Sequence, residues 1–374
     1  MTSQQRYCFL CEFFDSMAGI VRQYQLYFYP EDNSIEMHDI KNKKVFLKRV
    51  VYPEITSKEL FIGSDINVYS RKLKIVDYAD GFTKKLLEET RSTTYGMIKP
   101  DSYINIGKII DAIYNQGGFT ISKLKMCRLR LEDVEKFYAE HIGKAFYENL
   151  INFMSSDYMV GMELVKKDAI KSWREFIGPT NSNTARIQAP NSIRAMFGTD
   201  GTKNATHGSD SSSSAQKELD FIFNGKIKSQ PQLNNCSCLV IKPHAILEGN
   251  AGKIIEILLC EGFEISCMEM FYLDKTTAEE FFEVYKGVLP EYSAIIEHIT
   301  SGPIIVMEIR QENVVNSLRT LVGPHDPDIA KILRPNTLRS MFGKDRVKNA
   351  VHCTDLPEDG VLEVQFFFEL LQDK

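Results

Sequence analysis

The feature that most constrains this chain is an internal repeat, because two similar segments are expected to adopt one fold. The string YGMIKPD recurs as LVIKPHA, WREFIGP recurs as LRTLVGP, and SIRAMFG recurs as TLRSMFG. Matching residues keep an almost constant spacing, since Lys99 and Lys242 are 143 positions apart and His207 and His352 are 145 apart. The sequence therefore predicts two tandem domains of the same fold.

Within each copy, apolar strands alternate with amphipathic helices. Ile109, Ile110 and Ile113 recur at helical spacing, whereas ISKLKM alternates as a strand does. Further strands are expected at DYMVGMEL and GPIIVMEI. A sheet covered by helices gives an α/β or α+β domain. We assign the copies to residues 91–233 and 234–374.

Residues 1–90 have no counterpart in either copy and read as a small, mainly β, PH-like domain. QYQLYFYP alternates, SIEMHDI and KVFLKRV read as two strands around a polar turn, and NVYSRKLKIVDYAD adds another. The string KNKKVFLKR places five cations in nine positions. It indicates either a solvated hairpin edge protected by lysines or a contact for an acidic protein surface.

Composition narrows the class of protein. A chain of 374 residues exceeds the usual size of one core, and a net charge of −5 argues against a general binder of nucleic acid. The N-terminus lacks a basic stretch followed by an apolar run, and no segment approaches the ~18 apolar residues of a membrane span. We expect a soluble intracellular protein with no nucleic acid or membrane partner.

The cysteines are predicted to be structural thiols. Cys8 and Cys11 form a CxxC, and Cys236 and Cys238 form a CxC, but neither has a second pair at zinc-site spacing. In a strand, Cys8 and Cys11 would point to opposite faces, which further weakens a metal-binding interpretation.

A group of residues around His207 is suited to phosphoryl chemistry. Cations can neutralise phosphate oxygens, a neutral imidazole is a nucleophile near pH 7, and a carboxylate can fix its tautomer. The candidate residues in the first copy are Lys99, Arg174, Thr180, Arg194, Asn204, His207, Ser209 and Glu218.

Two common phosphoryl-transfer classes are excluded by sequence. There is no GxxxxGK[ST] loop, and the near match EGNAGKII has Ile where a magnesium-binding hydroxyl is required. The HRD and DFG motifs of protein kinases are also absent. EGNAGKII and the matching string INIGKII of the first copy are both interpreted as starts of well-packed helices.

The set formed by IKPD, Tyr138 and Phe146 in FYAEHIGKAF, Arg174, Thr180, Arg194 and NATHGSDS resembles the nucleoside diphosphate kinase family. The resemblance covers about residues 91–374, as two copies. It implies a ferredoxin-like βαββαβ core and ping-pong transfer of a terminal phosphate between nucleoside di- and triphosphates through a phosphohistidine.

The resemblance also implies a role for each matching position. His207 matches the phosphorylated residue, Glu218 and Ser209 match the groups that orient it, and Lys99 and Tyr138 match residues near the transferred phosphate. Mg²⁺ is expected to bridge the nucleotide phosphates without a direct protein ligand. The remaining positions match contacts to the phosphates (Arg174, Thr180, Arg194), to the ribose (Asn204) and to the base (Phe146).

The second copy retains only part of this pattern. The matching residues are Lys242, Arg319, Arg339, Asn349, His352, Thr354 and Glu363. The second copy departs from the family pattern at four positions. Where the pattern has Tyr, Phe, Thr and Asp, this copy has Phe282, Pro290, His325 and His244 respectively. Tyr292 lies near the position of the Phe that stacks on the base. Losing one contact to developing charge costs on the order of 10²–10³ in rate, so we expect the second site to be weak or silent.

Two functions follow from the resemblance. The first is a nucleoside diphosphate kinase whose first copy carries the activity. The second is a structural component of ciliary doublet microtubules, because a β domain ahead of two kinase copies resembles the branch of the family associated with cilia and centrosomal microtubules. This implies tubulin or other ciliary microtubule proteins as partners and the cytoplasm, cytoskeleton, axoneme and centrosome or basal body as locations. The resemblance also leaves two assemblies open, namely the hexamer usual in the family and a pairing of the two copies with each other within one chain.

Overall fold

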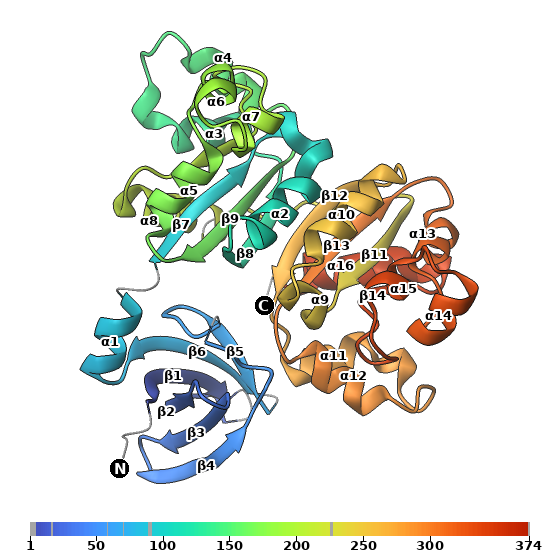
Figure 1. The fold of residues 1–374 in the computed structure, drawn as a ribbon. Helices are drawn as coiled ribbons and strands as arrows, with labels where there is room; N and C mark the ends of the chain where they lie inside the picture. The colour runs from blue at the N-terminus through green and yellow to red at the C-terminus, as the bar shows by residue number, and fades with distance from the viewer. Residues whose placement is uncertain are drawn as a thin grey trace. The chain divides into compact units, whose positions relative to one another are not determined.

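The structure is a computed structural model that describes residues 5–15, 18–57, 59–69, 71–88, 92–224 and 227–372 (Figure 1). The chain forms two compact units. The first unit contains residues 1–91 and 272–303, and the second unit contains residues 92–271 and 304–374. The segment 272–303, which belongs to the second copy in sequence, is therefore part of the same compact unit as the β domain. Among the described residues, no helix combines the length and apolar character needed to cross a bilayer.

The β domain of the first unit is a six-stranded antiparallel sheet with the order β4-β3-β2-β1-β6-β5. The segment predicted as one strand at NVYSRKLKIVDYAD is instead a hairpin of β5 and β6, because the chain turns at Tyr69, whose φ is +44°. The elements of the unit are β1 (Tyr7–Asp15), β2 (Ile20–Tyr29), β3 (Ser34–Asp39), β4 (Lys44–Val51), β5 (Asp65–Val68), β6 (Arg71–Tyr78), α1 (Gly81–Glu88), α11 (Lys275–Phe281), η3 (Glu283–Tyr285) and α12 (Tyr292–Ile299).

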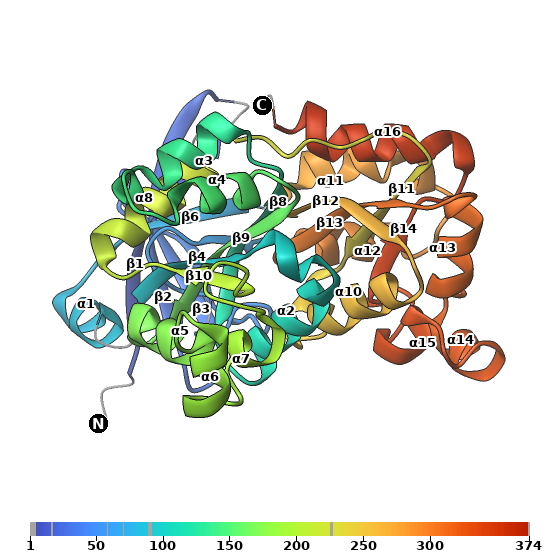
Figure 2. The same cartoon turned by 90° about the horizontal axis from the view of Figure 1, so that it is seen from above.

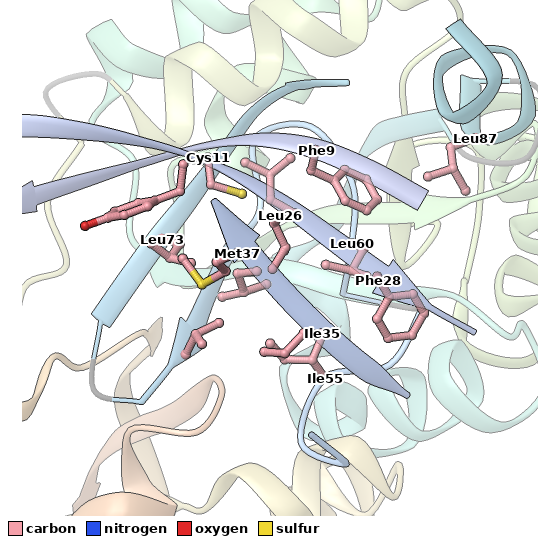
Figure 3. Packing of buried hydrophobic residues seen from close by; sticks show 14 residues of the cluster. Phe9, Cys11, Leu26, Phe28, Ile35, Met37, Ile55, Leu60, Leu73 and Leu87 are labelled. Atoms are coloured by element: carbon pink, nitrogen blue, oxygen red, sulfur yellow. The ribbon is translucent and has the colours of Figure 1, made fainter. Parts of the chain in front are cut away.

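One face of this sheet covers a core of aliphatic and aromatic side chains, shown in Figure 3. Along β2, Leu26 and Phe28 are buried two residues apart, which is the period that places both on one face of a strand. Cys11 belongs to the same core, whereas Cys8 is buried outside it and accepts a hydrogen bond from Gln25 Nε2 at 3.1 Å. The two thiols thus have different surroundings, as the alternation of a strand requires.

The second unit contains an eight-stranded sheet with the order β10-β7-β9-β8-β12-β13-β11-β14. In each half the strands lie in the order fourth, first, third, second, which confirms the predicted ferredoxin-like fold. The first copy consists of β7 (Ser92–Ile98), η1 (Pro100–Asn105), α2 (Ile106–Asn115), β8 (Thr120–Cys127), α3 (Leu131–Phe137), η2 (Ala139–His141), α4 (Tyr147–Met154), β9 (Met159–Lys166), α5 (Ala169–Ile177), α6 (Ser182–Gln188), α7 (Ile193–Phe197), β10 (Thr206–Gly208) and α8 (Ser212–Phe223).

The second copy repeats this order within the same unit. Its elements there are β11 (Cys236–Ile241), α9 (Pro243–Leu247), α10 (Ala251–Cys260), β12 (Glu264–Phe271), β13 (Ile304–Arg310), α13 (Val314–Val322), α14 (Pro327–Leu333), α15 (Leu338–Phe342), β14 (Val351–Cys353), η4 (Pro357–Asp359), α16 (Gly360–Gln365) and η5 (Phe366–Leu370).

The two copies pair with each other through one strand and one helix from each. Strands β8 and β12 are neighbours in the sheet, where Lys125 Nζ lies 3.2 Å from Glu269 Oε1. Helices α2 and α10 lie side by side (Figures 1 and 2). At their contact, a Cβ atom on Gly107 would stand 2.3 Å from the backbone nitrogen of Glu256, and one on Gly252 would stand 2.2 Å from that of Asp111. The two glycines therefore allow the helices to approach backbone to backbone.

We expect Gly107→Ala to lower the free energy of unfolding by about 1–3 kcal/mol, because the added methyl group meets backbone rather than a movable side chain. The measurement is chemical denaturation of the full chain. Gly201→Ala is the matched control, since the nearest neighbour of its added Cβ is 3.9 Å away. Equal stability of the two variants would contradict the close packing of α2 on α10.

Candidate active site

His207 lies on the short edge strand β10, whose backbone is held on both sides. The strand pairs with β7, with His207 opposite Met97. Trp173, which is fully buried on α5, donates its Nε1–H to the carbonyl oxygen of His207 at 3.1 Å. A Cβ on Gly208 would stand 2.5 Å from the Trp173 ring, so glycine is required there for the ring to reach the strand. The indole therefore positions the backbone that carries the candidate nucleophile.

The imidazole of His207 is oriented by a carboxylate on α8. Its Nε2 lies 2.9 Å from Glu218 Oε1, and the hydroxyl of Ser209 donates to the other oxygen of that carboxylate. An ionised carboxylate only accepts hydrogen bonds, so Nε2 carries the proton and Nδ1 keeps its lone pair. The serine-rich start of α8 has Ser211 as its N-cap, accepting from Ser214 N at 3.2 Å, which places Glu218 two turns into the helix.

The imidazole is surrounded by aromatic rings. The ring centroids of Tyr95, Phe137 and Tyr138 lie 6.1, 5.8 and 6.2 Å from that of His207. Burial raises the pKa of Tyr138 well above its usual value. Its buried hydroxyl has no hydrogen-bond partner among the described residues. Tyr138 thus keeps its proton and has an unused donor beside the imidazole, which suits an incoming phosphate oxygen.

Two buried cations face this region without a carboxylate partner. Lys99, 6% exposed, donates from Nζ to Asn204 Oδ1 at 2.8 Å and to the carbonyl of Thr202 at 3.1 Å. Arg194, 9% exposed, donates to the carbonyl of Gly178 at 2.8 Å and to that of Thr206 at 3.0 Å. Neither cation has an ion pair among the described residues, so both retain charge that a polyanion could neutralise.

The electrostatic cost of burying these cations appears in their pKa values. The pKa of Lys99 is lowered to about 8, mainly because of desolvation and secondly because of the charge of Arg194. Desolvation, and next the charge of Arg174, lowers the pKa of Arg194 to about 10. Since an opposite charge would reverse both effects, the site is prepared for an anionic ligand.

A cavity of about 790 Å³ brings these groups together, a volume typical of a small-molecule site. Phe146, 46% exposed, is one of its walls, and its ring lies 5.7 Å from that of His141 in an edge-on contact. Of the residues predicted for the first site, Ser209 alone does not line the cavity, because it is buried behind Glu218. The predicted residues that do are Lys99, Tyr138, Phe146, Arg174, Thr180, Arg194, Asn204, His207 and Glu218.

Nucleotide affinity is expected to fall as the pH rises through 8. The charged form of Lys99 binds phosphate, and with a pKa of about 8 its charged fraction drops about tenfold between pH 7 and pH 9. If binding requires that form, the apparent Kd for ADP rises roughly tenfold over this interval. Calorimetric titration at pH 7, 8 and 9 tests this. The Lys99→Met variant should bind more weakly with a flat profile, and an unchanged slope in that variant would contradict the assignment.

The second copy reproduces the arrangement around the histidine. His352 Nε2 lies 3.0 Å from Glu363 Oε2, and Thr354 Oγ1 donates to the same oxygen at 3.0 Å. Arg339 donates to the carbonyls of Gly323 and Val351 at 3.0 and 3.2 Å, as its counterpart does in the first copy. The candidate nucleophile and the groups that orient it are therefore present twice.

The groups that would hold a nucleotide differ in the second copy. Arg319 forms an ion pair with Asp355, whereas its counterpart Arg174 has none among the described residues. Asn349 Nδ2 donates to the carbonyl of His325 at 3.0 Å, as Asn204 Nδ2 does to that of Thr180, but it also lies 3.2 Å from the ring nitrogen Nδ1 of His325. Burial lowers the pKa of His244 to about 4, so this residue is neutral near pH 7.

Lys242 is the counterpart of Lys99, but His244 stands beside it in place of the carboxylate of Asp101. Lys242, 3% exposed, donates to the carbonyl of Val347 at 3.0 Å. Desolvation, and next the charge of Arg339, lowers its pKa to about 7, below that of its counterpart in the first copy. A lysine that is half neutral at pH 7 neutralises phosphate poorly. The remaining altered positions, Phe282, Pro290 and Tyr292, lie in the segment that belongs to the first unit.

Sequence reasoning gave no role to three contributors to the first site, although the quoted string IKPD includes Asp101. Trp173 positions the strand of His207, His141 lines the cavity beside Phe146, and Asp101 accepts a hydrogen bond from the backbone of Ala205 at 3.0 Å. Trp173 is the single tryptophan of the chain, which was an available signal. Among the described residues, no group of three or more His, Cys, Asp or Glu side chains could hold a metal ion, and all eight cysteines are free thiols.

Comparisons with known proteins agree with this geometry. A sequence model described as Nucleoside diphosphate kinase matches residues 92–227 and 235–372, and one described as Nucleoside diphosphate kinase 7 N-terminal PH domain matches residues 1–89. The chain is 46% identical over 373 residues to Nucleoside diphosphate kinase homolog 7 of Rattus norvegicus and of Mus musculus, covering 99% of this chain and 94% of each relative. It is 50% identical over 131 residues to a Nucleoside diphosphate kinase of Aquifex aeolicus, covering 34% of this chain and 92% of that protein.

Proposed function

This chain belongs to the nucleoside diphosphate kinase family, and from that premise we propose that its first copy transfers the terminal phosphate of a nucleoside triphosphate to a nucleoside diphosphate through a phosphohistidine at His207. The observation that carries the proposal is the contact of Glu218 with Nε2 of His207, which leaves Nδ1 as the nucleophilic nitrogen in a cavity with two buried cations.

The proposed reaction has two symmetric halves. Nδ1 of His207 attacks the γ-phosphorus, a bond forms between nitrogen and phosphorus, and the bond to the bridging oxygen breaks. The electron pair leaves with the nucleoside diphosphate. A second nucleoside diphosphate then attacks the phosphohistidine with its terminal oxygen, which regenerates the neutral imidazole. Glu218 stabilises the positive charge on the ring during both halves, since its ionised carboxylate accepts a hydrogen bond from Nε2–H.

The cationic residues hold the phosphates during transfer. Lys99, Arg194 and Arg174 line the cavity and would neutralise the negative charge of the phosphate oxygens. The hydroxyl of Tyr138 supplies a further donor, and Phe146 offers a ring face to the base. A ring face stacks on any base without reading its edges, so we expect broad tolerance of the base.

Magnesium would enter with the nucleotide. Four carboxylates line the cavity, namely Glu140, Glu175, Asp210 and Glu218, but Glu218 is bonded to His207 and no metal-binding group forms among the described residues. This donor set fits an ion carried by the phosphates and not one held by side chains. When bound, Mg²⁺ would add to the charge neutralisation of the phosphates.

Initial-rate kinetics test the proposal. The full chain is assayed with ATP as donor and GDP as acceptor, with each varied at several fixed concentrations of the other. A covalent phosphoenzyme predicts parallel lines in double-reciprocal plots, because the first product leaves before the second substrate binds. Intersecting lines would show that both nucleotides bind together, which would exclude the proposed intermediate.

A structural role at ciliary microtubules is a second candidate function, supported by the exposed edge of the β domain. Strand β4 is the last strand of the sheet, and its residues Lys44, Val45, Phe46 and Lys48 are exposed. The strand combines unpaired backbone groups, apolar side chains and positive charge, which suit an acidic surface such as that of tubulin. This proposal places the protein in the cytoplasm and cytoskeleton, at the axoneme and at the centrosome or basal body.

Co-sedimentation of the full chain with microtubules tests the structural role. Reversing two charges on β4 with Lys44→Glu and Lys48→Glu should weaken binding, and more so at low salt, because exposed charges are screened by salt. The control carries Lys167→Glu and Lys171→Glu, which reverse the same number of exposed charges in the first copy. Equal binding by both double variants would remove β4 from this role.

A further inference from the structure

A second cavity, of about 280 Å³, lies within the first unit and shares no residue with the nucleotide cavity. The β domain forms one side of it, through β5 and residues next to β4 and β5, and the helical segment with α11 and α12 forms the other. The β domain contributes Tyr52, Asn67 and Tyr69 to the lining, and the contributions of the helical segment include Glu279, Tyr292 and Glu297.

Asn67 is a buried side chain in the wall of this cavity with one unused polar atom. It is 3% exposed, and its Nδ2 donates to the carbonyl of Thr300 and to that of Leu273 at 3.2 Å. The Oδ1 atom has no partner among the described residues. Because both donors of the amide are used, the atom left without a partner is an acceptor, and a buried acceptor without a partner is destabilising. A ligand that donates a hydrogen bond would remove this cost.

Aromatic rings form further walls. The rings of Tyr52 and Tyr69 lie 5.2 Å apart at an interplanar angle of 68°, and the hydroxyl of Tyr52 accepts a hydrogen bond from the backbone nitrogen of Tyr69 at 3.3 Å. Tyr69 has a φ of +44° in the β5–β6 turn, where Asn or Gly is usual. The turn therefore carries a bulky side chain on a residue whose backbone is left-handed. Tyr292 adds a third ring from α12.

The charge of the lining is negative. Among the described residues, Lys275 is the only cation that lines the cavity, and its Nζ lies 3.7 Å from Glu279 Oε1. Glu297 has no ion pair among the described residues. The carboxylates act electrostatically on the rings. Burial is the largest cause that raises the pKa of Tyr52, and the charge of Glu297 contributes to the same shift. Burial also raises the pKa of Tyr292, and the charge of Glu279 is the second cause there.

We propose that this cavity binds an organic cation with the size of a guanidinium or trimethylammonium group. The π faces of tyrosine rings attract a cation, and the carboxylates of Glu279 and Glu297 supply the opposite charge. A guanidinium would also donate to Oδ1 of Asn67. An anion would meet two carboxylates, and an apolar group would leave the asparagine oxygen without a partner. The cation comes either from an arginine or methylated lysine side chain of another protein or from a free small molecule.

The site is tested by methyl NMR on the full chain, with Ile296 as the reporter because this residue lines the cavity. The Ile296→Val variant assigns its δ1-methyl signal. The probes are capped arginine amide, capped trimethyllysine amide, the free cation agmatine, and capped norleucine amide as the uncharged control. We expect the signal to shift with the cations, with a Kd on the order of millimolar, and not with norleucine amide.

The comparison of probes identifies the source of the cation. Capped arginine or trimethyllysine amide binding as well as agmatine indicates a protein side chain, whereas binding of agmatine alone indicates a free cation. Glu297→Gln should weaken binding at least fivefold, while Glu261→Gln, which removes the same charge from outside the lining, should not. No shift with any cation up to 20 mM, on the order of the weakest affinity expected of a specific site, overturns the proposal. An equal shift with norleucine amide also overturns it.

Discussion

His207→Gln is expected to abolish nucleoside triphosphate formation, with a loss on the order of 10⁴-fold or more. The amide of glutamine can replace the hydrogen bond of Nε2 to Glu218, but it has no nucleophilic nitrogen, so covalent transfer at this position is lost. The rate is measured with ATP and GDP at saturating concentrations. The fold should survive, since Trp173 contacts the backbone of residue 207 and not its side chain.

The equivalent change in the second copy is the natural comparison. His352→Gln should retain most of the rate, because Arg319 is paired with Asp355 and Lys242 has a pKa of about 7. Loss of activity in this variant, with retention in His207→Gln, would assign the reaction to the second copy. If both variants kept full activity, neither histidine would be the nucleophile.

Lys99→Met is expected to reduce the rate by about 10²–10³, because it removes one charge that stabilises the developing phosphate charge in a buried site. Lys99 is 6% exposed and has no ion pair, so its loss leaves no buried carboxylate unpaired, although Asn204 Oδ1 loses a donor. Methionine fills a similar volume, which keeps the packing. The readout is kcat and KM for ATP in the same assay.

A matched variant separates the effect of losing Lys99 from the effect of removing any lysine from the chain. Lys108→Met removes an exposed lysine from α2, outside the cavity, and should leave both constants unchanged. A rate for Lys99→Met within threefold of the wild type, a difference of about 0.7 kcal/mol in the barrier, would show that this ammonium does not act on the transferred phosphate.

Periodic and repeated features of the chain were predictable. The two copies, the strand at ISKLKM and the helices after Gly107 and Gly252 follow from patterns that local geometry enforces. The helix that carries Glu218 begins in the serine run, and a start of this kind can be read from sequence because serine caps helices. In these cases the residues that define the element are neighbours in sequence.

Contacts between distant segments were not predictable in the same way. The string NGKIKSQPQLNN reads as a loose connector, yet the backbone nitrogens of Gln232 and Leu233 donate to the fully buried carboxylate of Glu308 at 2.8 and 2.7 Å. The carboxylate lies on β13, far along the chain, and nothing local to either segment indicates the contact. The same holds for Asn67, whose amide reaches the segment at residues 272–303.

The central claim is that His207 accepts a phosphate, and labelling tests it most directly. The full chain is incubated with γ-labelled ATP, the reaction is stopped in alkali, and labelled peptides are mapped. The account predicts label that is acid-labile and base-stable on the peptide containing His207, and that leaves the protein when GDP is added. Label that is acid-stable, or that resides on the peptide of His352 alone, would contradict it.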